Sequence, residues 1–134
     1  MKAKVVITRG TDGRYEANME YYEQLNFGLF GEGNTVEETI ADFHICANEM
    51  KSLYTEEGKK FPKLDFDFEY DVASFLQYYL DTLSLAGIGR LTGINRKQLS
   101  HYLTGKSQPS VKTIKKIEEA LQKFGKELSH INLV

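Results

Sequence analysis

Apolar and polar residues alternate along the first part of the chain, as they do in strands that bury one face. The alternation predicts two strands joined by a turn at Thr11, Asp12 and Gly13. The residues expected on the buried face are Ala3, Val5, Ile7, Tyr15, Ala17, Met19 and Tyr21. We predict a third strand over residues 26–31, where Gly28 and Gly31 indicate a bulge or a close backbone approach.

After residue 35 the spacing of the apolar residues changes from that of a strand to that of a helix. Thr35 and Glu38 have the spacing of a capping box, in which the two side chains accept hydrogen bonds from backbone N–H groups at the helix start. The apolar stripe of this helix is expected to be Val36, Ile40, Phe43, Ala47, Met50 and Tyr54. We predict that the helix ends before Gly58.

A last strand is predicted over residues 64–71, where aromatic and acidic residues alternate. Its aromatic face carries Phe66, Phe68 and Tyr70. Its acidic face carries Asp65, Asp67, Glu69 and Asp71, and Asp71 also stands where the cap of a following helix is expected. The N-terminal half therefore has the element order β-β-β-α-β. Four to five short helices follow it, which makes the chain an α+β protein.

Residues 84–105 contain the glycines and apolar residues that two helices joined by a tight turn require. Gly89 provides a small residue at the helix crossing, and Gly93 tolerates a positive φ in the turn. The apolar residues around them are Ile88, Leu91, Ile94, Leu99, Tyr102 and Leu103. Helical periodicity predicts further helices over residues 72–83 and 111–124.

The second helix of this pair is expected over residues 95–104. Its outward residues are cationic or carry amide, hydroxyl or imidazole groups, as contacts in a DNA major groove require, and they are Asn95, Arg96, Lys97, Gln98, Ser100 and His101. Arg96 or Lys97 would pair with guanine, and Gln98 or Asn95 with adenine; Asn95 has the alternative of serving only as the helix N-cap. Residues after the helix that suit phosphate contacts are Lys106, Ser107, Gln108 and Lys112.

From Ile88 to Lys106 the chain resembles the lambda-repressor-like (Cro/C1) family of helix-turn-helix DNA-binding domains. The shared pattern is an aliphatic residue and a small one, then Thr-Gly-aliphatic, then Tyr-Leu-x-Gly-Lys. Gly89 departs from this pattern, because the family more often has alanine there. The resemblance implies that the C-terminal half binds operator DNA, and one such domain reads so few base pairs that a homodimer or higher homo-oligomer is expected.

The two halves of the chain carry opposite charge. Residues 1–71 contain eight Lys and Arg against fifteen Asp and Glu, a net charge of −7, and residues 72–134 contain nine against four, a net charge of +5. A cationic helical region attracts DNA phosphates, whereas an anionic region suits a basic protein. Acidic surfaces also confer solubility alone, so the charge by itself leaves both explanations of the N-terminal half open.

The element order and the segment GEGNTVEETI, residues 31–40, make the N-terminal half resemble the HicB family of antitoxins. The matching residues are Gly33, Thr35, Glu37 and Glu38 of the family's Gly-x-Thr-x-Glu-Glu element. The family's Pro-x-x-Pro-Gly segment is missing before it, and Thr39 replaces the usual alanine. The resemblance implies a partial ribonuclease-H-like fold over residues 1–70, which binds a toxin, and a DNA-binding domain with a C-terminal tail over residues 71–134.

This resemblance implies a type II antitoxin that neutralises a HicA-like toxin, a small basic ribonuclease, and represses its own operon. The acidic residues that would contact the toxin are Asp65, Asp67, Glu69 and Asp71. A solvated outer face, or an edge strand protected by charge, explains the same residues. The alternative function is a helix-turn-helix transcriptional regulator whose N-terminal domain senses a small ligand or another protein. A nuclease or a structural adaptor is a further alternative.

The sequence predicts no catalytic residue, no metal site and no cofactor. A two-metal nuclease needs carboxylates that converge, and only Glu16 and Glu20 are candidate neighbours of the acidic strand. His44, His101 and His130 lack catalytic or ligand spacing, and Cys46 has no second cysteine with which to pair. The sequence offers no membrane span or signal peptide, so a cytoplasmic protein is expected. The apolar tail, residues 127–134, would pair with a second copy or cover its own domain.

Overall fold

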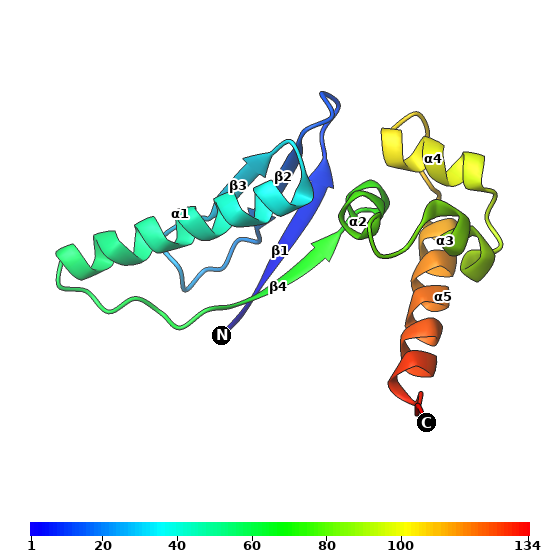
Figure 1. The fold of residues 1–134 in the computed structure, drawn as a ribbon. Coiled ribbons are helices and arrows are strands. Elements are labelled where there is room, and N and C mark those ends of the chain that lie inside the picture. The colour runs from blue at the N-terminus through cyan, green and yellow to red at the C-terminus, as the bar shows by residue number, and fades with distance from the viewer. The chain divides into compact units, whose positions relative to one another are not determined.

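A computed structural model describes all of residues 1–134, and the chain folds into two units, Met1–Tyr78 and Tyr79–Val134. The strands of the first unit are β1 (Lys2–Arg9), β2 (Tyr15–Met19), β3 (Phe30–Gly33) and β4 (Asp65–Tyr70). Helix α1 (Val36–Glu56) precedes β4, and α2 (Val72–Tyr79) follows it (Figure 1). The second unit contains α3 (Leu85–Thr92), α4 (Arg96–Thr104) and α5 (Val111–Ser129). The α+β layout expected from the sequence is confirmed.

The four strands form one sheet in the order β3-β2-β1-β4. The predicted hairpin is confirmed, because β1 and β2 pair antiparallel and Gly13 in the turn has a φ of 84°. Strand β4 pairs parallel with β1, which requires a crossover connection, and α1 provides it. Strand β4 therefore lies at one edge of the sheet and β3 at the other.

The core of the first unit lies between the sheet and α1. Of the strand residues that the alternation predicted for the buried face, Ala3, Val5, Ile7, Tyr15 and Ala17 are buried. Met19 is half-buried. The prediction was wrong for Tyr21, which is 86% exposed because β2 ends at Met19. Helix α1 contributes buried residues at helical spacing, and they are Val36, Thr39, Phe43 and Ala47. The aromatic face of β4 packs on the same core through Phe66, Phe68 and Tyr70. The opposite face of the sheet carries mostly polar and charged side chains, together with Val6 and Phe30.

The third strand lies further along the chain than residues 26–31, so that prediction of its position was wrong. The close backbone approach that Gly31 indicated is confirmed, because a Cβ atom there would lie 2.5 Å from the backbone nitrogen of Phe43 in α1. Around Gly28 there is open space, and no close approach occurs. The strand forms where glycine lets α1 lie directly against the sheet, and the preceding segment instead buries Leu25 and Leu29.

Helix α1 begins with the predicted capping interaction. The backbone N–H of Glu38 donates to Thr35 Oγ1 at 3.1 Å. The returning bond differs by one residue from a standard capping box, because Glu38 Oε2 accepts from the backbone N–H of Asn34 at 2.9 Å. The helix ends before Gly58, as predicted, and that glycine has a φ of 69°.

Helix α2 ends at Tyr79, four residues before the predicted end of the helix over residues 72–83. A turn follows, in which the N–H groups of Thr82 and Leu83 donate to the carbonyl of Tyr79. Asp71 caps α2, since its Oδ1 accepts from the N–H of Ser74 at 2.8 Å. The contacts of α2 place it with the first unit, so the two units divide after Tyr78, whereas the domain boundary expected from the sequence falls after residue 70.

Helix α5 is longer than the periodicity predicted and continues to Ser129. The last residues form no strand, which differs from the strand-like ending expected over residues 127–134. Leu133 is 91% exposed and Ile131 is 56% exposed, so the tail does not cover its own unit. None of the five helices combines the length and the apolar character that crossing a bilayer demands.

Candidate nucleic-acid interface

Helices α3 and α4 are joined by a tight turn whose residues each have a defined role. Gly93 ends α3 in the left-handed conformation, with a φ of 75°, and its N–H donates to the carbonyl of Gly89 at 2.8 Å. Thr92 is buried, and its Oγ1 donates to the carbonyl of Ile88 at 2.7 Å and accepts from the N–H of Ile94 at 3.2 Å. The conformation of the turn is therefore fixed on both sides of the glycine.

The close crossing predicted for Gly89 is confirmed. A Cβ atom at Gly89 would lie 2.9 Å from the carbonyl oxygen of Ile94, so the turn comes nearer to α3 than an alanine would allow without a shift. The interior of this unit is formed by residues that are almost fully buried, and they are Ile88, Leu99, Tyr102 and Ile117. Helices α3, α4 and α5 therefore share one small apolar core, and α4 presents its other side to solvent.

The first turn of α4 begins with a capping residue and continues with two exposed cationic residues. Asn95 is the N-cap, because its Oδ1 accepts from the N–H of Lys97 at 2.7 Å. Of the two roles open for this residue, the capping role is the one that the structure contains. Arg96 and Lys97 follow directly and are exposed. The unpaired N–H groups of a helix start also give this end of α4 a partial positive charge.

Gln98 connects α4 to the loop that follows it. Its Nε2 donates to Ser107 Oγ at 3.0 Å, and the backbone N–H of Ser107 donates to the carbonyl of His101 at 3.3 Å. The amide of Gln98 retains a second N–H and its carbonyl oxygen for an external partner. The predicted base-contacting and phosphate-contacting groups therefore lie side by side at this position.

The remaining predicted residues lie around the same helix and loop. Ser100 and His101 are half-buried in the second turn of α4, while Lys106 and Gln108 are exposed in the loop. Lys112 is exposed in the first turn of α5, next to the N-cap Ser110. All three ion pairs of the protein lie in the first unit, so no Lys or Arg of the second unit is neutralised by a carboxylate.

Sequence reasoning missed the part of Thr92. The sequence indicated Thr92 only as the threonine of the Thr-Gly-aliphatic pattern. In the structure its hydroxyl hydrogen-bonds both to α3 and to the residue after the glycine of the turn. A signal for it is present in the sequence, because a threonine directly before the αL glycine can bond both backwards and forwards along the backbone. No comparable signal predicted the hydrogen bond between Gln98 and Ser107.

Six of the fifteen acidic residues of the first unit lie on the open face of the sheet. Six of the eight charged residues on this face are acidic, and all six are exposed. The eight residues are Lys2, Lys4, Glu16, Glu20, Glu32, Asp65, Asp67 and Glu69. We refer to this surface as the acidic face. It is broader than the single strand that the sequence indicated, because β2 and β3 add Glu16 and Glu32 as direct cross-strand partners.

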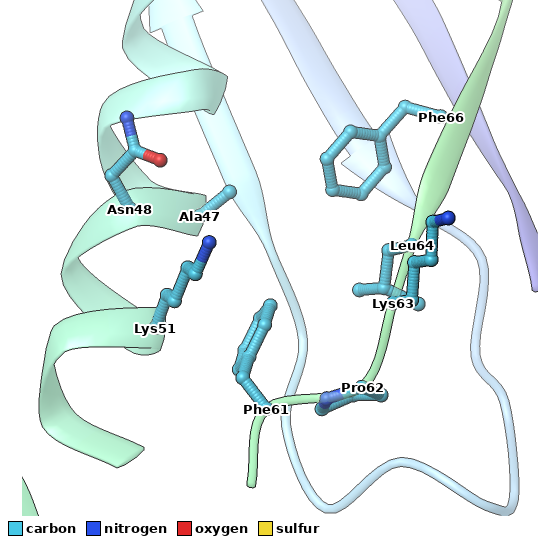
Figure 2. Close-up of a pocket in the computed structure, with 8 residues that line it drawn as sticks. All are labelled: Ala47, Asn48, Lys51, Phe61, Pro62, Lys63, Leu64 and Phe66. Carbon is cyan, nitrogen blue, oxygen red and sulfur yellow. The ribbon is translucent and has the colours of Figure 1, made fainter. Parts of the chain in front are cut away.

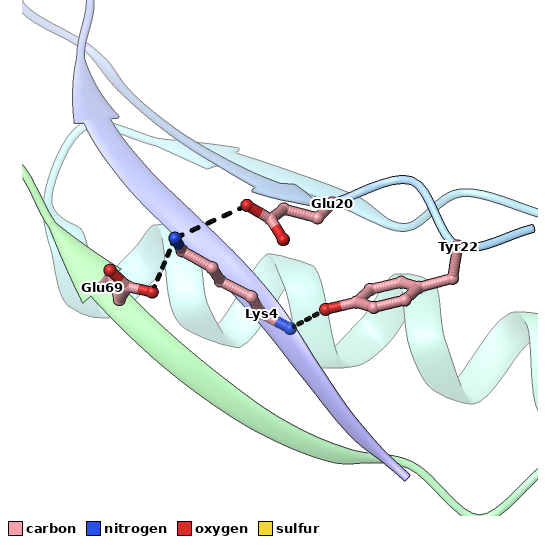
Figure 3. Close-up of polar contacts among 4 residues, drawn as sticks. All are labelled: Lys4, Glu20, Tyr22 and Glu69. Atoms are coloured by element: carbon pink, nitrogen blue, oxygen red, sulfur yellow. Dashed lines mark hydrogen bonds and ion pairs between the residues drawn. The ribbon is translucent and has the colours of Figure 1, made fainter.

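Lys4 lies in the middle of the acidic face and interrupts it. Figure 3 shows its Nζ between Glu69 Oε2, at 3.0 Å, and Glu20 Oε1, at 3.5 Å. The hydrogen bond to Glu69, aided by the charge of Glu20, raises the pKa of the Lys4 ammonium group. The backbone N–H of Lys4 donates to the Tyr22 hydroxyl at 2.7 Å, which fixes the segment after β2 against the same strand.

Asp71 differs from the other three acidic residues predicted to contact a partner. One of its carboxylate oxygens caps α2, and the other accepts from the backbone N–H of Arg9 at 3.0 Å. Both oxygens therefore have structural partners. Asp65, Asp67 and Glu69 are exposed along the edge strand β4. No group of three or more His, Cys, Asp or Glu side chains is positioned to hold a metal ion.

The short helices, the glycine-capped turn and the exposed cationic start of α4 define a helix-turn-helix DNA-binding domain. Residues 80–123 match the family model described as helix-turn-helix. This match covers about a third of the chain and supports a DNA-binding transcriptional regulator. Neither the curated proteins nor the solved structures include a match to the chain.

Proposed function

We propose that this regulator is the antitoxin of a HicA/HicB-type toxin–antitoxin pair, and that it represses its own operon. The acidic face is the observation that supports this function best. A basic ribonuclease would be attracted to a surface on which six exposed carboxylates surround a single half-buried Lys4 and an exposed Lys2. The β-β-β-α-β order, which carried the resemblance to the HicB family, is present in the first unit. The partial ribonuclease-H-like fold is part of the same proposal.

The opposite charges of the two units suit the two partners of the proposed antitoxin. The first unit carries −7 and would repel nucleic acid, while the second carries +5 and attracts it. A basic partner bound to the first unit would cover its own RNA-binding surface with the acidic face. Complementary charge of this kind raises the association rate and specificity more than the final affinity.

On DNA, we propose that the first two turns of α4 enter the major groove. Arg96 and Lys97 would reach base edges, and Gln98 would use its remaining amide groups on a neighbouring base. The residues that we assign to phosphates are Lys106, Ser107, Gln108 and Lys112. A homodimer would place two such helices about one helical turn of DNA apart. The exposed apolar tail supports such a dimer, because Leu133 and Ile131 have no partner surface within their own unit.

The proposed roles on DNA predict different results for two single variants, one of Arg96 and one of Lys106. Arg96→Ala is expected to lower the affinity of the protein for operator DNA by about tenfold or more, since a base contact is worth about 1–3 kcal/mol. Its affinity for unrelated DNA should fall by less. Lys106→Ala should weaken binding to all DNA sequences alike. It should also reduce the slope of log affinity against log salt concentration by about 1. Fluorescence anisotropy over a range of salt concentrations measures both. Equal losses on every sequence for both variants would contradict the assignment.

Neutralising the edge of the acidic face is expected to slow capture of the basic partner. The variant carries Asp65→Asn, Asp67→Asn and Glu69→Gln, and it leaves Asp71 unchanged because that residue caps α2. At low salt the association rate constant should fall by about tenfold, and the difference should shrink at high salt. Stopped-flow mixing with the purified partner measures it.

The matched control for this experiment removes three exposed acidic residues elsewhere in the first unit. It carries Glu23→Gln, Glu49→Gln and Glu56→Gln and therefore has the same net charge. If both variants slow association equally, only net charge matters and the acidic face has no special part. If neither does, the edge strand is a solvated surface.

The second candidate is a regulator whose first unit senses a small ligand. A pocket favours it that is lined by residues 47–51 in the last part of α1 and residues 61–66 before and in β4. The neighbouring reading frame distinguishes the two functions. A short basic coding sequence with a HicA-like Gly-Ser-His element, whose product copurifies with this chain, supports the antitoxin. If no such coding sequence is present, the regulator that senses a small ligand is favoured.

A further inference from the structure

One edge of the sheet is left without a backbone partner. Strand β4 is an outermost strand and pairs only with β1, on one of its two sides (Figure 1). The N–H of Asp65 donates toward that side, to the carbonyl of Met1 at 2.9 Å. Backbone groups point to alternate sides along a strand, so the N–H and C=O groups of Phe66 and Phe68 point away from β1. No group of the chain forms a hydrogen bond with them.

This free edge of β4 lacks the features that usually block the addition of a strand. It is six residues long, contains no proline or glycine, and pairs with β1 in a continuous register without a bulge. Natural sheets often protect an edge with a short strand, a proline or a bulge. The opposite edge, β3, is shorter, and two of its four residues are glycines. Strand β4 is therefore the edge that suits a further strand.

The core side of the free edge is an aromatic surface that ends in a cavity. The rings of Phe66 and Phe68 are half-buried and meet the buried Phe43 edge-on, with centroids 5.0 Å and 5.8 Å away. His44, which is exposed on α1, contacts both rings as well. Figure 2 shows the Phe66 ring directed from β4 toward α1, across a cavity of about 340 Å³ from Ala47. Apolar side chains of an added strand would pack on this surface and into the cavity.

The outer side of the same edge is acidic, and its charge selects the strand that can be added. Asp65 and Asp67 are exposed and form no ion pair, whereas Glu69 is held by Lys4. If β4 of a second copy paired antiparallel through the free backbone groups, acidic residues of one copy would lie opposite acidic residues of the other. Like charges directly opposite each other are destabilising, and opposite charges are stabilising. The edge therefore disfavours a second copy and favours a segment that carries basic residues on this side.

We propose that the free edge of β4 binds an extended segment of a basic partner protein as an added strand of the sheet. Apolar and basic residues alternate in this segment. Its apolar side chains lie over Phe66, Phe68 and the cavity, and its basic side chains lie beside Asp65 and Asp67. In this mode of binding the backbone hydrogen bonds provide affinity, and the alternate side chains provide specificity. The proposal rests on the proposed function for the source of the segment, and it adds how that partner is held.

The probe that tests this edge is the peptide Lys-Val-Lys-Val-Lys-Val, capped at both ends, added to the full-length chain and followed by residue-resolved amide NMR. The amide protons of Phe66 and Phe68 are expected to shift and to become protected from hydrogen exchange, because they gain acceptors. Those of Asp65 and Asp67 face β1 already and should gain little protection. The peptide Glu-Val-Glu-Val-Glu-Val should bind about tenfold more weakly or worse. Absence of saturable binding, or binding that leaves Phe66 and Phe68 unprotected, would overturn the proposal.

Two N-methylated forms of the peptide test the addition of a strand directly. One form carries methyl groups on the backbone nitrogens of its valines, and the other on those of its lysines. Alternate N–H groups of a strand point to the same side, so only one of the two sets faces β4. One form is therefore expected to lose about tenfold or more in affinity while the other binds as the unmethylated peptide does. Loss in the valine form indicates an antiparallel strand and loss in the lysine form a parallel one, whereas equal results for both forms contradict strand addition.

Two double variants of the protein locate the bound peptide. Asp65→Asn with Asp67→Asn is expected to weaken the lysine peptide about tenfold. Glu16→Gln with Glu32→Gln removes the same charge from β2 and β3, on the same face but away from β4, and should bind nearly as the unmodified chain does. The proposal is wrong if the two double variants lose affinity equally, or if the first loses none.

The peptide experiments separate this proposal from the antitoxin function. If the peptide adds to β4 while no basic protein copurifies with the chain, the docking edge stands and the antitoxin function is wrong. If a basic protein copurifies while the peptide fails to protect Phe66 and Phe68, the docking edge is wrong and the antitoxin function stands.

Discussion

Leu99→Ala is expected to lower the free energy of unfolding of the C-terminal unit by about 3 kcal/mol, since large-to-small changes at fully buried leucines typically cost 2–5 kcal/mol. Leu99 is 0% exposed and lies on α4 opposite the residues proposed to read DNA. The cavity would loosen the contact between α4 and α3, and DNA binding should fall with it. Residue-resolved amide hydrogen exchange in the full-length chain measures the loss.

Leu133→Ala is the matched control for this change, because the same atoms are removed from a side chain that is 91% exposed. Stability of the unit should change by less than about 0.5 kcal/mol in the control. Exchange in the first unit should be unaffected by either variant. A loss of protection in the sheet on Leu99→Ala would show that the two units unfold together, and the description of two separate cores would be wrong.

Gly31→Ala is expected to destabilise the first unit by about 3 kcal/mol, at the upper end of what overpacking costs. A Cβ atom at Gly31 would lie 2.5 Å from the nitrogen and 2.7 Å from the Cα of Phe43, and 2.6 Å from the carbonyl oxygen of Thr39. These are backbone atoms of α1, so the helix itself would have to move away from β3. Chemical denaturation followed by amide signals of β1 and α1 measures the effect.

Gly28→Ala provides the control, since a Cβ atom at Gly28 meets nothing within 4 Å. This variant should be neutral or slightly more stable, because alanine reduces the conformational freedom of the unfolded chain. A Gly31→Ala variant as stable as Gly28→Ala would contradict the close packing of α1 on β3.

Much of the fold was predictable because local rules agree with the tertiary packing. The alternation in β1 and β2, the Thr35 cap and the αL glycine at residue 93 each follow from one or two residues, and each is confirmed. The position of β3 was not predictable from the alternation. The four residues of that strand contain two glycines, and their place is determined by contact with α1, which lies later in the sequence.

The candidate sites were predictable in part. The sequence identified α4 and its exposed residues, yet periodicity could not show that Asn95 would use its side chain on the backbone of α4 or that Gln98 would bond Ser107. It identified the acids of β4 and named Glu16 and Glu20 as candidate neighbours, but it did not identify Glu32 of β3, because the strand order decides which residues share a face. The pocket at the end of α1 left no sequence signal, since its lining comes from two separate segments, residues 47–51 and 61–66.

The central claim is that one unit binds DNA and the other binds a basic protein, each through its own surface. The most direct measurement coexpresses the chain with the product of the neighbouring reading frame and scores partner copurification and operator binding for two variants. Arg96→Ala should keep the partner and lose the operator, and Asp65→Asn, Asp67→Asn, Glu69→Gln should weaken the partner and keep the operator. Loss of both activities in either variant, or a partner that never copurifies with the unmodified chain, would contradict the account.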